Sequence, residues 1–275
     1  MPASYKPSDG DLVVVNCTKR YHGAGHEVFT ALDGMNLTVA RGTVVSIVGS
    51  NGAGKSTLLS IVSGNVLPDA GRVIVRGADI TSLPSWKRVR TVARVRQNPE
   101  FNMLSALTIE ENFTLALARG RGRFGLRIAG GQHVRNAARD VLAPLGMGLE
   151  KRLGTITGAL SGGQRQAMAV AMASIGEPAV LLLDEHVAAL DPNSARRVNE
   201  ITDELVRKAN ITTLMVTHDM GHALERSDRL IMLHAGRIVL DIDRRLDAGL
   251  SIQDLHDRFA ALVGQTLPDE TLLSS

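Results

Sequence analysis

Apolar residues in the first third of the chain occur in short runs that turn residues separate. Runs rich in Val, Ile and Thr, placed between Gly, Pro and Asp, predict β-strands. One helix is expected among them, beginning at Lys55 or Ser56 and running to Gly64, because glycine is favoured directly after a helix. The predicted strands cover residues 12–17, 35–42, 43–49 and 72–77 (LVVVNC, MNLTVARG, TVVSIVG and RVIVRG).

The pattern changes between about Leu83 and Leu160. Apolar positions recur at helical spacing in residues 108–118 and 132–145 (TIEENFTLALA and QHVRNAARDVLAPL). The positions between them are filled largely by residues that favour helices. We therefore predict a helical lobe over about residues 84–160.

Helices and continuous apolar strands alternate from Ser161 onward, in residues 161–176, 179–185, 194–209 and 212–218. Strands that are apolar at every position and lie between helices indicate a parallel sheet with both faces covered. This predicts one α/β domain over residues 11–245. A loose tail (1–10) is expected before it, and residues 246–275 are expected to hold one amphipathic helix, 252–263, and a polar end.

Composition narrows the class of protein. Hydrophobic residues make up 44% and charged residues 21% of the chain, as in ordinary globular proteins. A formal net charge of +3 is too small to favour a nucleic-acid partner. No apolar stretch approaches the roughly 18–20 residues that cross a bilayer, so the chain is not expected to span a membrane. Cys17 is the single cysteine, and we expect a buried thiol without an internal disulfide.

A glycine-rich segment between a predicted strand and a predicted helix matches the phosphate-loop pattern GxxxxGK[ST]. Glycines let consecutive backbone N–H groups approach phosphate oxygens, and the start of the following helix adds a partial positive charge. Lys55 is expected to reach the β- and γ-phosphates, and Ser56 to bind Mg²⁺. The predicted nucleotide-binding residues are Gly49, Ser50, Asn51, Gly52, Ala53, Gly54, Lys55, Ser56 and Thr57.

Two acids follow the apolar run 179–183 and suggest the hydrolytic half of a nucleotide site. The end of a buried parallel strand is where such sheets present residues to ligands. Asp184 is expected to bind Mg²⁺, directly or through water, and Glu185 to act as general base for the attacking water. Taken alone, the same residues are equally consistent with a strand that ends in a solvated acidic turn. The phosphate loop upstream favours a nucleotide hydrolase.

Residues 160–166 (LSGGQRQ) resemble the signature sequence of ATP-binding-cassette (ABC) ATPases and stand ahead of a predicted helix. In that family the signature of one subunit closes over ATP held by another. The resemblance therefore implies a head-to-tail pair of cassettes with two shared sites. It assigns Ser161, Gly162, Gly163 and Gln164 to nucleotide binding.

The same resemblance assigns functions to residues that, taken singly, would not indicate a function. Gln97 matches the glutamine that senses the γ-phosphate, and it is also expected to ligate Mg²⁺. Asp191 matches the loop that crosses the dimer interface, and His218 matches the switch histidine that contacts the γ-phosphate. Tyr21 is the best candidate for the aromatic residue that stacks on adenine, and Phe29 is a weaker one.

The resemblance covers about residues 12–240 and implies a P-loop NTPase core with a mostly parallel sheet, an antiparallel β lobe and a helical lobe. Such a chain binds ATP and Mg²⁺ and hydrolyses ATP to move a substrate through separate transmembrane permease subunits. Its expected partners are a second copy or a homologous cassette, the permease and, in an importer, a periplasmic substrate-binding protein. The expected place is the cytoplasmic face of the inner membrane, as a peripheral subunit. The permease is expected to contact residues around 97–117.

His186 departs from the family pattern, in which proline usually follows the catalytic glutamate. We interpret it as a bystander, and the alternative is that it tunes the water near Glu185. The order Asp184, Glu185, His186 also resembles a bacterial subgroup of ATPases for uptake of aromatic amino acids such as tryptophan or tyrosine. This favours import of an amino acid or a similar small solute.

A multi-subunit exporter would show the same features in this chain and is the alternative to an importer. ATPases of the superfamily that do not transport fit the sequence less well. DNA-repair ATPases of the superfamily carry a long coiled coil, and translation factors usually carry two cassettes; neither pattern is found in the sequence. Arginines at 119, 121, 123 and 127 belong either to a lipid-facing segment or to a solvated loop.

Overall fold

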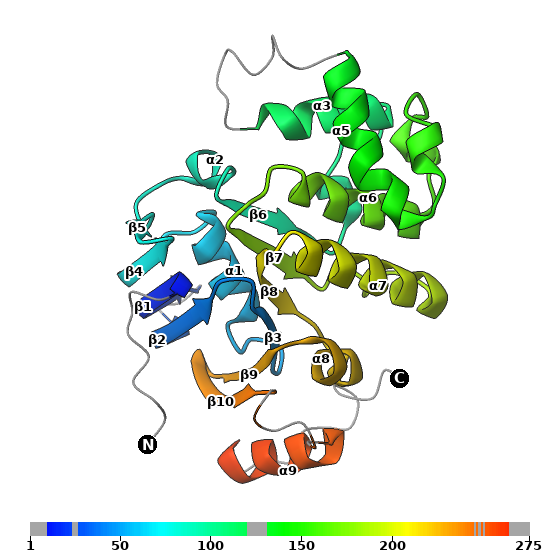
Figure 1. Ribbon diagram of the computed structural model, residues 1–275. Helices are drawn as coiled ribbons and strands as arrows, with labels where there is room; N and C mark the ends of the chain where they lie inside the picture. Colours follow the sequence, from blue (N-terminus) through cyan, green and yellow to red (C-terminus); the bar gives the residue numbers. More distant parts are fainter. Residues whose placement is uncertain are drawn as a thin grey trace. The chain divides into compact units, whose positions relative to one another are not determined.

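The computed structural model describes residues 10–23, 27–119, 131–244, 246, 249 and 251–263. The chain divides into two compact units (Figure 1). Unit 1 comprises Met1–Pro84 and Thr212–Ser275, and unit 2 comprises Ser85–Ile211. Apart from Arg119, the arginine-rich segment considered for lipid contact falls outside the described residues.

Unit 1 contains an antiparallel sheet with the strand order β2-β1-β4-β5. β1 (Gly10–His22) lies between β2 (Val28–Ala40) and β4 (Ala70–Val75). The two-residue strand β5 (Ala78–Asp79) pairs with β4. β1 and β2 are longer than the apolar runs that predicted them, because polar residues continue the ladder.

The other strands of unit 1 build the predicted parallel core. β3 (Val44–Val48) is buried at every position and lies between β8 (Thr212–Val216) and β9 (Arg229–His234), parallel to both. β10 (Arg237–Asp243) forms an antiparallel hairpin with β9. The helices of this unit are α1 (Lys55–Ser63), α8 (Met220–Arg226) and α9 (Ile252–Val263).

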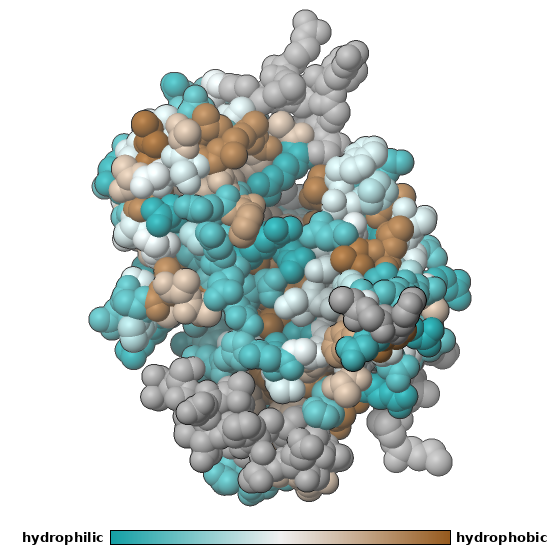
Figure 2. All heavy atoms as spheres, turned by 180° about the vertical axis from the view of Figure 1, so that it is seen from behind, coloured by the Kyte–Doolittle hydropathy of each residue, from teal (hydrophilic) through white to brown (hydrophobic). Residues whose placement is uncertain are grey.

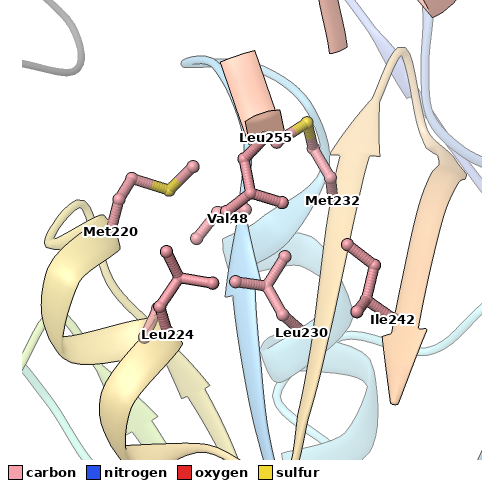
Figure 3. Close-up of a cluster of buried hydrophobic side chains, with 8 residues drawn as sticks. Val48, Met220, Leu224, Leu230, Met232, Ile242 and Leu255 are labelled. Carbon is pink, nitrogen blue, oxygen red and sulfur yellow. The ribbon is translucent and has the colours of Figure 1, made fainter. Parts of the chain in front are cut away.

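A cluster of buried apolar side chains joins these elements (Figure 3). Val48, the last residue of β3, packs with Leu230 and Met232 of β9, Leu224 of α8 and Leu255 of α9. Burial of such side chains contributes about 1.5–3 kcal/mol each to stability. The cluster therefore fixes the end of the strand from which the predicted phosphate loop begins.

Unit 2 combines two parallel strands with helices. β6 (Val92–Val95) pairs with β7 (Val180–Asp184). α6 and α7 pack against each other, and so do α3 and α5. The α-helices are α2 (Ser85–Arg88), α3 (Ile109–Ala118), α5 (Gln132–Leu142), α6 (Gly162–Ser174) and α7 (Pro192–Lys208), and the 3₁₀ turns are Pro99–Phe101, Ala143–Leu145, Leu149–Lys151 and Thr157–Ala159.

Helix ends follow the local signals in the sequence. Gly64 ends α1 in the left-handed region, with a φ of 78°. At the start of α3 the Thr108 hydroxyl accepts a hydrogen bond from the Glu111 N–H, and the Thr108 N–H donates to the Glu111 carboxylate. The Glu111 carboxylate accepts hydrogen bonds from the Thr108 N–H and from the Thr108 hydroxyl, and these two bonds, the backbone one first, lower the pKa of Glu111. The predictions for both helices are confirmed.

β6 falls where the sequence predicted only helices. The strand is four residues long (VARV), and a charged residue, Arg94, occupies its third position. So short a run gives no readable strand period. β6 is stabilised instead by pairing with β7, which lies more than eighty positions further along the chain.

Two general expectations can also be compared with the structure. Cys17 is fully buried in β1, and this burial raises the pKa of its thiol. Within the described part of the chain, no helix has both the length and the apolarity to cross a bilayer.

Candidate functional site

The predicted phosphate loop leaves the carboxyl end of β3 and leads into α1, all within unit 1. Gly49 has a φ of 142°, and a Cβ there would lie 2.2 Å from the carbonyl oxygen of Leu233. Gly54 has a φ of 104°, and a Cβ there would lie 2.4 Å from the carbonyl oxygen of Ala31. Both positions therefore require glycine, for the backbone angle and for the close approach of neighbouring backbone.

Backbone hydrogen bonds connect this loop to β2 and to the β9–β10 turn. The N–H of Gly236 donates to the carbonyl oxygen of Ala53 at 3.1 Å. The N–H of Asp33 in turn donates to the carbonyl oxygen of Gly236 at 3.1 Å. The conformation of the loop is therefore built into the fold of unit 1.

Lys55, the first residue of α1, is only 6% exposed. Its ammonium group donates to the carbonyl oxygens of Gly49 at 2.6 Å and Ser50 at 3.0 Å. No side chain caps α1, because its N-cap residue is Gly54. N–H groups in the first turn of a helix have no acceptor within the helix. A positive charge and backbone donors thus gather at one point, which suits a phosphate group.

β8 brings His218 to the edge of the sheet where the loop begins. β8 runs parallel to β3, with Val216 opposite Ile47. The N–H of Thr217 donates to the carbonyl oxygen of Ile47 at 3.3 Å, and His218 follows as a half-buried residue. The carboxyl ends of parallel strands are where open α/β sheets bind ligands.

Tyr21 and Phe29 stand directly opposite each other in the β1–β2 ladder. Residues paired in this way project from the same face of a sheet. Their exposed fractions are 39% and 54%. Phe29 lies two positions, or about 7 Å, before Ala31 on the same strand. The carbonyl oxygen of Ala31 is the atom that approaches Gly54 of the predicted phosphate loop. The structure therefore places the stronger and the weaker aromatic candidate on one exposed surface.

Unit 2 presents the predicted acids at the carboxyl end of β7. Val95 of β6 pairs with Leu183 of β7. Gln97 lies two positions after Val95, and Glu185 lies two positions after Leu183, so both residues follow the same end of this strand pair. Gln97 is exposed, and Glu185 is half-buried. Glu185 has a φ of 47°, which is uncommon for a residue with a side chain. Strained backbone of this kind concentrates at functional sites.

Asp184 forms an ion pair with Arg94 on the neighbouring strand. Nη2 of Arg94 lies 2.5 Å from Oδ2 of Asp184, and the two side chains are only 13% and 18% exposed. Arg94 is paired with Leu182, two positions before Asp184, so both charged side chains lie on one face of the strand pair. No motif in the sequence predicted this contact.

α6 is connected to the segment that leads to Gln97. The Gln166 side chain, 1% exposed, donates from Nε2 to the carbonyl oxygen of Arg96 at 3.4 Å. Gln166 lies beyond the four signature residues selected from the sequence, and only the fold reveals this contact.

Ser161 and Asp191 cap two helices whose first turns are neighbours. The Ser161 hydroxyl accepts from the Gln164 N–H at 3.2 Å, and the Asp191 carboxylate accepts from the Ser194 N–H at 3.1 Å. Hydrogen bonds from Ser194, its side chain first, lower the pKa of Asp191. A Cβ at Gly163 would lie 3.1 Å from Cβ of Ser194, so α6 packs closely on α7 here and a side chain at this position would push Ser194 away by a few tenths of an ångström.

Comparison with known proteins identifies the family. The family model described as "ABC transporter" matches residues 32–188. The tyrosine transport ATP-binding protein of Clostridioides difficile (strain R20291) is 40% identical over 90% of this chain and 98% of its own length. The chain belongs to the ABC transporter family. The methionine import ATP-binding protein MetN of Rhizobium johnstonii is 37% identical over 76% of this chain and 56% of its own length.

Solved ABC cassettes share the fold. A dimeric cassette bound to ADP and phosphate has a TM-score of 0.72 at 29% identity, and the match covers 84% of this chain and 98% of that cassette. A cassette in its ADP conformation has a TM-score of 0.73 at 27% identity, over 90% of this chain and 97% of its own. The predicted fold class is confirmed, and the chain is an ATP-binding subunit with ATPase activity.

His186 of this ABC ATPase is a buried residue, only 3% exposed. Its Nε2 lies 3.3 Å from the Thr202 hydroxyl of α7. Because that hydroxyl donates to the carbonyl oxygen of Val198 at 2.7 Å, it accepts from the Nε2–H of His186. His186 therefore connects the turn after Glu185 to α7, a role that neither sequence interpretation specified.

Proposed function

We propose that this ABC ATPase powers import of an amino acid or a similar small solute, as a peripheral subunit at the cytoplasmic face of the membrane. The observation that carries the proposal is the match to nearly the full length of a tyrosine transport ATP-binding protein. Methionine import proteins among the other relatives support the same class of solute. The proposed partners are a second cassette, permease subunits and a periplasmic substrate-binding protein.

Exposed apolar side chains in unit 2 support docking on a permease. Figure 2 shows apolar residues gathered over the helical part of this unit. Phe101 is 69%, Leu104 is 56% and Ile156 is 53% exposed. The Thr157 hydroxyl donates to the carbonyl oxygen of Leu104 at 3.0 Å. Because Ile156 directly precedes Thr157, this hydrogen bond holds the segments of Leu104 and Ile156 next to each other. Exposed apolar patches of this kind are typical of protein interfaces.

Import is tested by uptake into vesicles. We expect the chain, purified with its permease and binding protein in vesicles, to drive ATP-dependent uptake of a radiolabelled amino acid, with tyrosine and methionine tried first. The same vesicles without the binding protein are the control. ATP-driven efflux without uptake would contradict import and favour an exporter.

The proposed catalytic cycle uses the residues that the sequence motifs select. Glu185 takes a proton from the attacking water while Lys55, Gln97, His218 and the partner's signature Ser161 stabilise charge on the γ-phosphate. Mg²⁺ prefers oxygen ligands, and the hydroxyl of Ser56, the carboxylate of Asp184 and the amide oxygen of Gln97 are donors of this kind. When bound, the ion would neutralise phosphate charge. Tyr21 and Phe29 are proposed to hold the adenine ring.

The cap of α6 supports a shared site between two cassettes. The Ser161 hydroxyl already accepts the Gln164 N–H, yet its own proton stays available, because a hydroxyl donates and accepts at once. It can therefore keep capping the helix and donate to a phosphate oxygen. Ser161 is exposed, as donation to a nucleotide on another chain requires.

A mixture of two defective variants tests the shared site. Ser161→Asp retains a good helix cap but removes the donor and adds a negative charge that repels phosphate. Alone, Ser161→Asp and Lys55→Ala chains should each be inactive. A mixed pair combines an intact phosphate loop from the first with an intact signature from the second, so ATP hydrolysis should return on mixing. A mixture as inactive as its components would rule out sharing.

A further inference from the structure

We propose that Arg94 is a positioning residue that holds Asp184 and keeps a divalent cation from binding tightly before the nucleotide phosphates are present. This inference rests on the proposed function, in which Asp184 binds Mg²⁺. It concerns a residue to which neither the sequence motifs nor the family resemblance gave a role.

The geometry of the pair carries the inference. Nη2 of Arg94 donates to Oδ2 of Asp184 at 2.5 Å, and a hydrogen bond between two charged groups is roughly twice as strong as one between neutral groups. Arg94 reaches Asp184 from the adjacent parallel strand, where its register is fixed by pairing with Leu182. With exposed fractions of 13% and 18%, both charges are shielded from most of the solvent. Their interaction is therefore stronger than that of a surface ion pair.

Charge explains why this contact should oppose a lone metal ion. A guanidinium group carries a positive charge. A divalent cation that approaches Asp184 meets this positive charge, and it must also share a carboxylate that already accepts a strong hydrogen bond. Without the cation, Arg94 satisfies the half-buried carboxylate of Asp184.

The nucleotide changes this balance. ATP brings several negative phosphate oxygens, which coordinate Mg²⁺ and outweigh the repulsion from one guanidinium group. Arg94 would then make metal binding at Asp184 dependent on ATP, and it would keep the carboxylate in one orientation between turnovers.

Titration with Mn²⁺ alone, followed by electron paramagnetic resonance of the free ion, tests the inference on the full chain. Removal of a positive charge beside the carboxylate lowers the repulsion that an approaching cation meets, so Arg94→Met should bind Mn²⁺ about tenfold more tightly than the unchanged protein. Arg94→Lys keeps the charge and should restore weak binding. Arg135→Met is the matched control, because it removes the exposed Arg135–Glu110 pair of the same unit, and its Mn²⁺ affinity should be unchanged.

The double variant Arg94→Met with Asp184→Asn tests whether Asp184 is the carboxylate that binds the added Mn²⁺. Its Mn²⁺ affinity should not exceed that of the unchanged protein. A gain that survives in the double variant, or Mn²⁺ binding by Arg94→Met no tighter than by Arg135→Met, would overturn the inference. Thermal unfolding verifies that the variants fold, and Arg94→Gln replaces Arg94→Met if that chain does not.

A separate measurement distinguishes this inference from the proposed function. If Asp184→Asn hydrolysed Mg·ATP normally, the assignment of Asp184 to the metal would fail. If Asp184→Asn is inactive and Arg94→Met shows no gain in Mn²⁺ affinity, only the role of Arg94 fails.

Discussion

Glu185→Gln is expected to abolish almost all ATP hydrolysis while ATP still binds. The amide has the size of the carboxylate but cannot take a proton from the attacking water, and general-base catalysis contributes about 10²- to 10⁴-fold to a rate. The backbone conformation at this position, with its φ of 47°, is retained because only the side-chain terminus changes. Steady-state phosphate release and equilibrium binding of a fluorescent ATP analogue measure the two effects separately.

The chain contains a close control for this variant. Glu177, just before β7, also has a left-handed backbone, with a φ of 46°, but it lies at the opposite end of the strand and is exposed. Glu177→Gln should therefore hydrolyse ATP at the normal rate. In addition, Glu185→Gln should accumulate an ATP-bound dimer, visible by size-exclusion chromatography. Hydrolysis by Glu185→Gln at more than a tenth of the normal rate would contradict its role as the base.

Lys55→Ala is expected to lose most ATP binding and hydrolysis. The ammonium group is held at the centre of the loop by the carbonyl oxygens of Gly49 and Ser50, where a phosphate would meet it. Removal of one such electrostatic contact typically lowers turnover by about 10²- to 10³-fold. Fluorescent-nucleotide binding and phosphate release are the measurements.

Lys55→Met separates charge from packing, because methionine retains most of the buried aliphatic chain. It should fold like the unchanged protein and be as inactive as Lys55→Ala. Lys87→Ala, which removes an exposed lysine, should have normal activity. If either Lys55 variant bound ATP with normal affinity, the assignment of the phosphate loop would be wrong.

The sequence predicted those elements whose signals are local. The helix at 252–263 carries its own apolar period, and the end of α1 is marked by Gly64. The strand before the phosphate loop and the strand before Asp184 are apolar throughout, which reports burial on both faces without knowledge of their neighbours.

Contacts between distant segments could not be predicted in this way. Arg94 and Asp184 meet only because β6 pairs with β7, and β6 is too short to show a strand period. Tyr21 and Phe29 share a surface because of the β1–β2 register, which shifts at several points and so defeats counting of alternate residues. The buried contact between His186 and Thr202 likewise needs the packing of α7.

The hairpin tip at Gly236 limits how this chain can be altered. Loop tips between strands are the usual places to insert an epitope, a fluorescent protein or a new domain, because they tolerate extra residues. Here, however, the tip accepts a hydrogen bond from Asp33 and donates one to Ala53 in the phosphate loop. Added residues would separate these partners and release the loop from its scaffold. For protein engineering, and for evolution by insertion, this turn therefore behaves as part of the proposed nucleotide site.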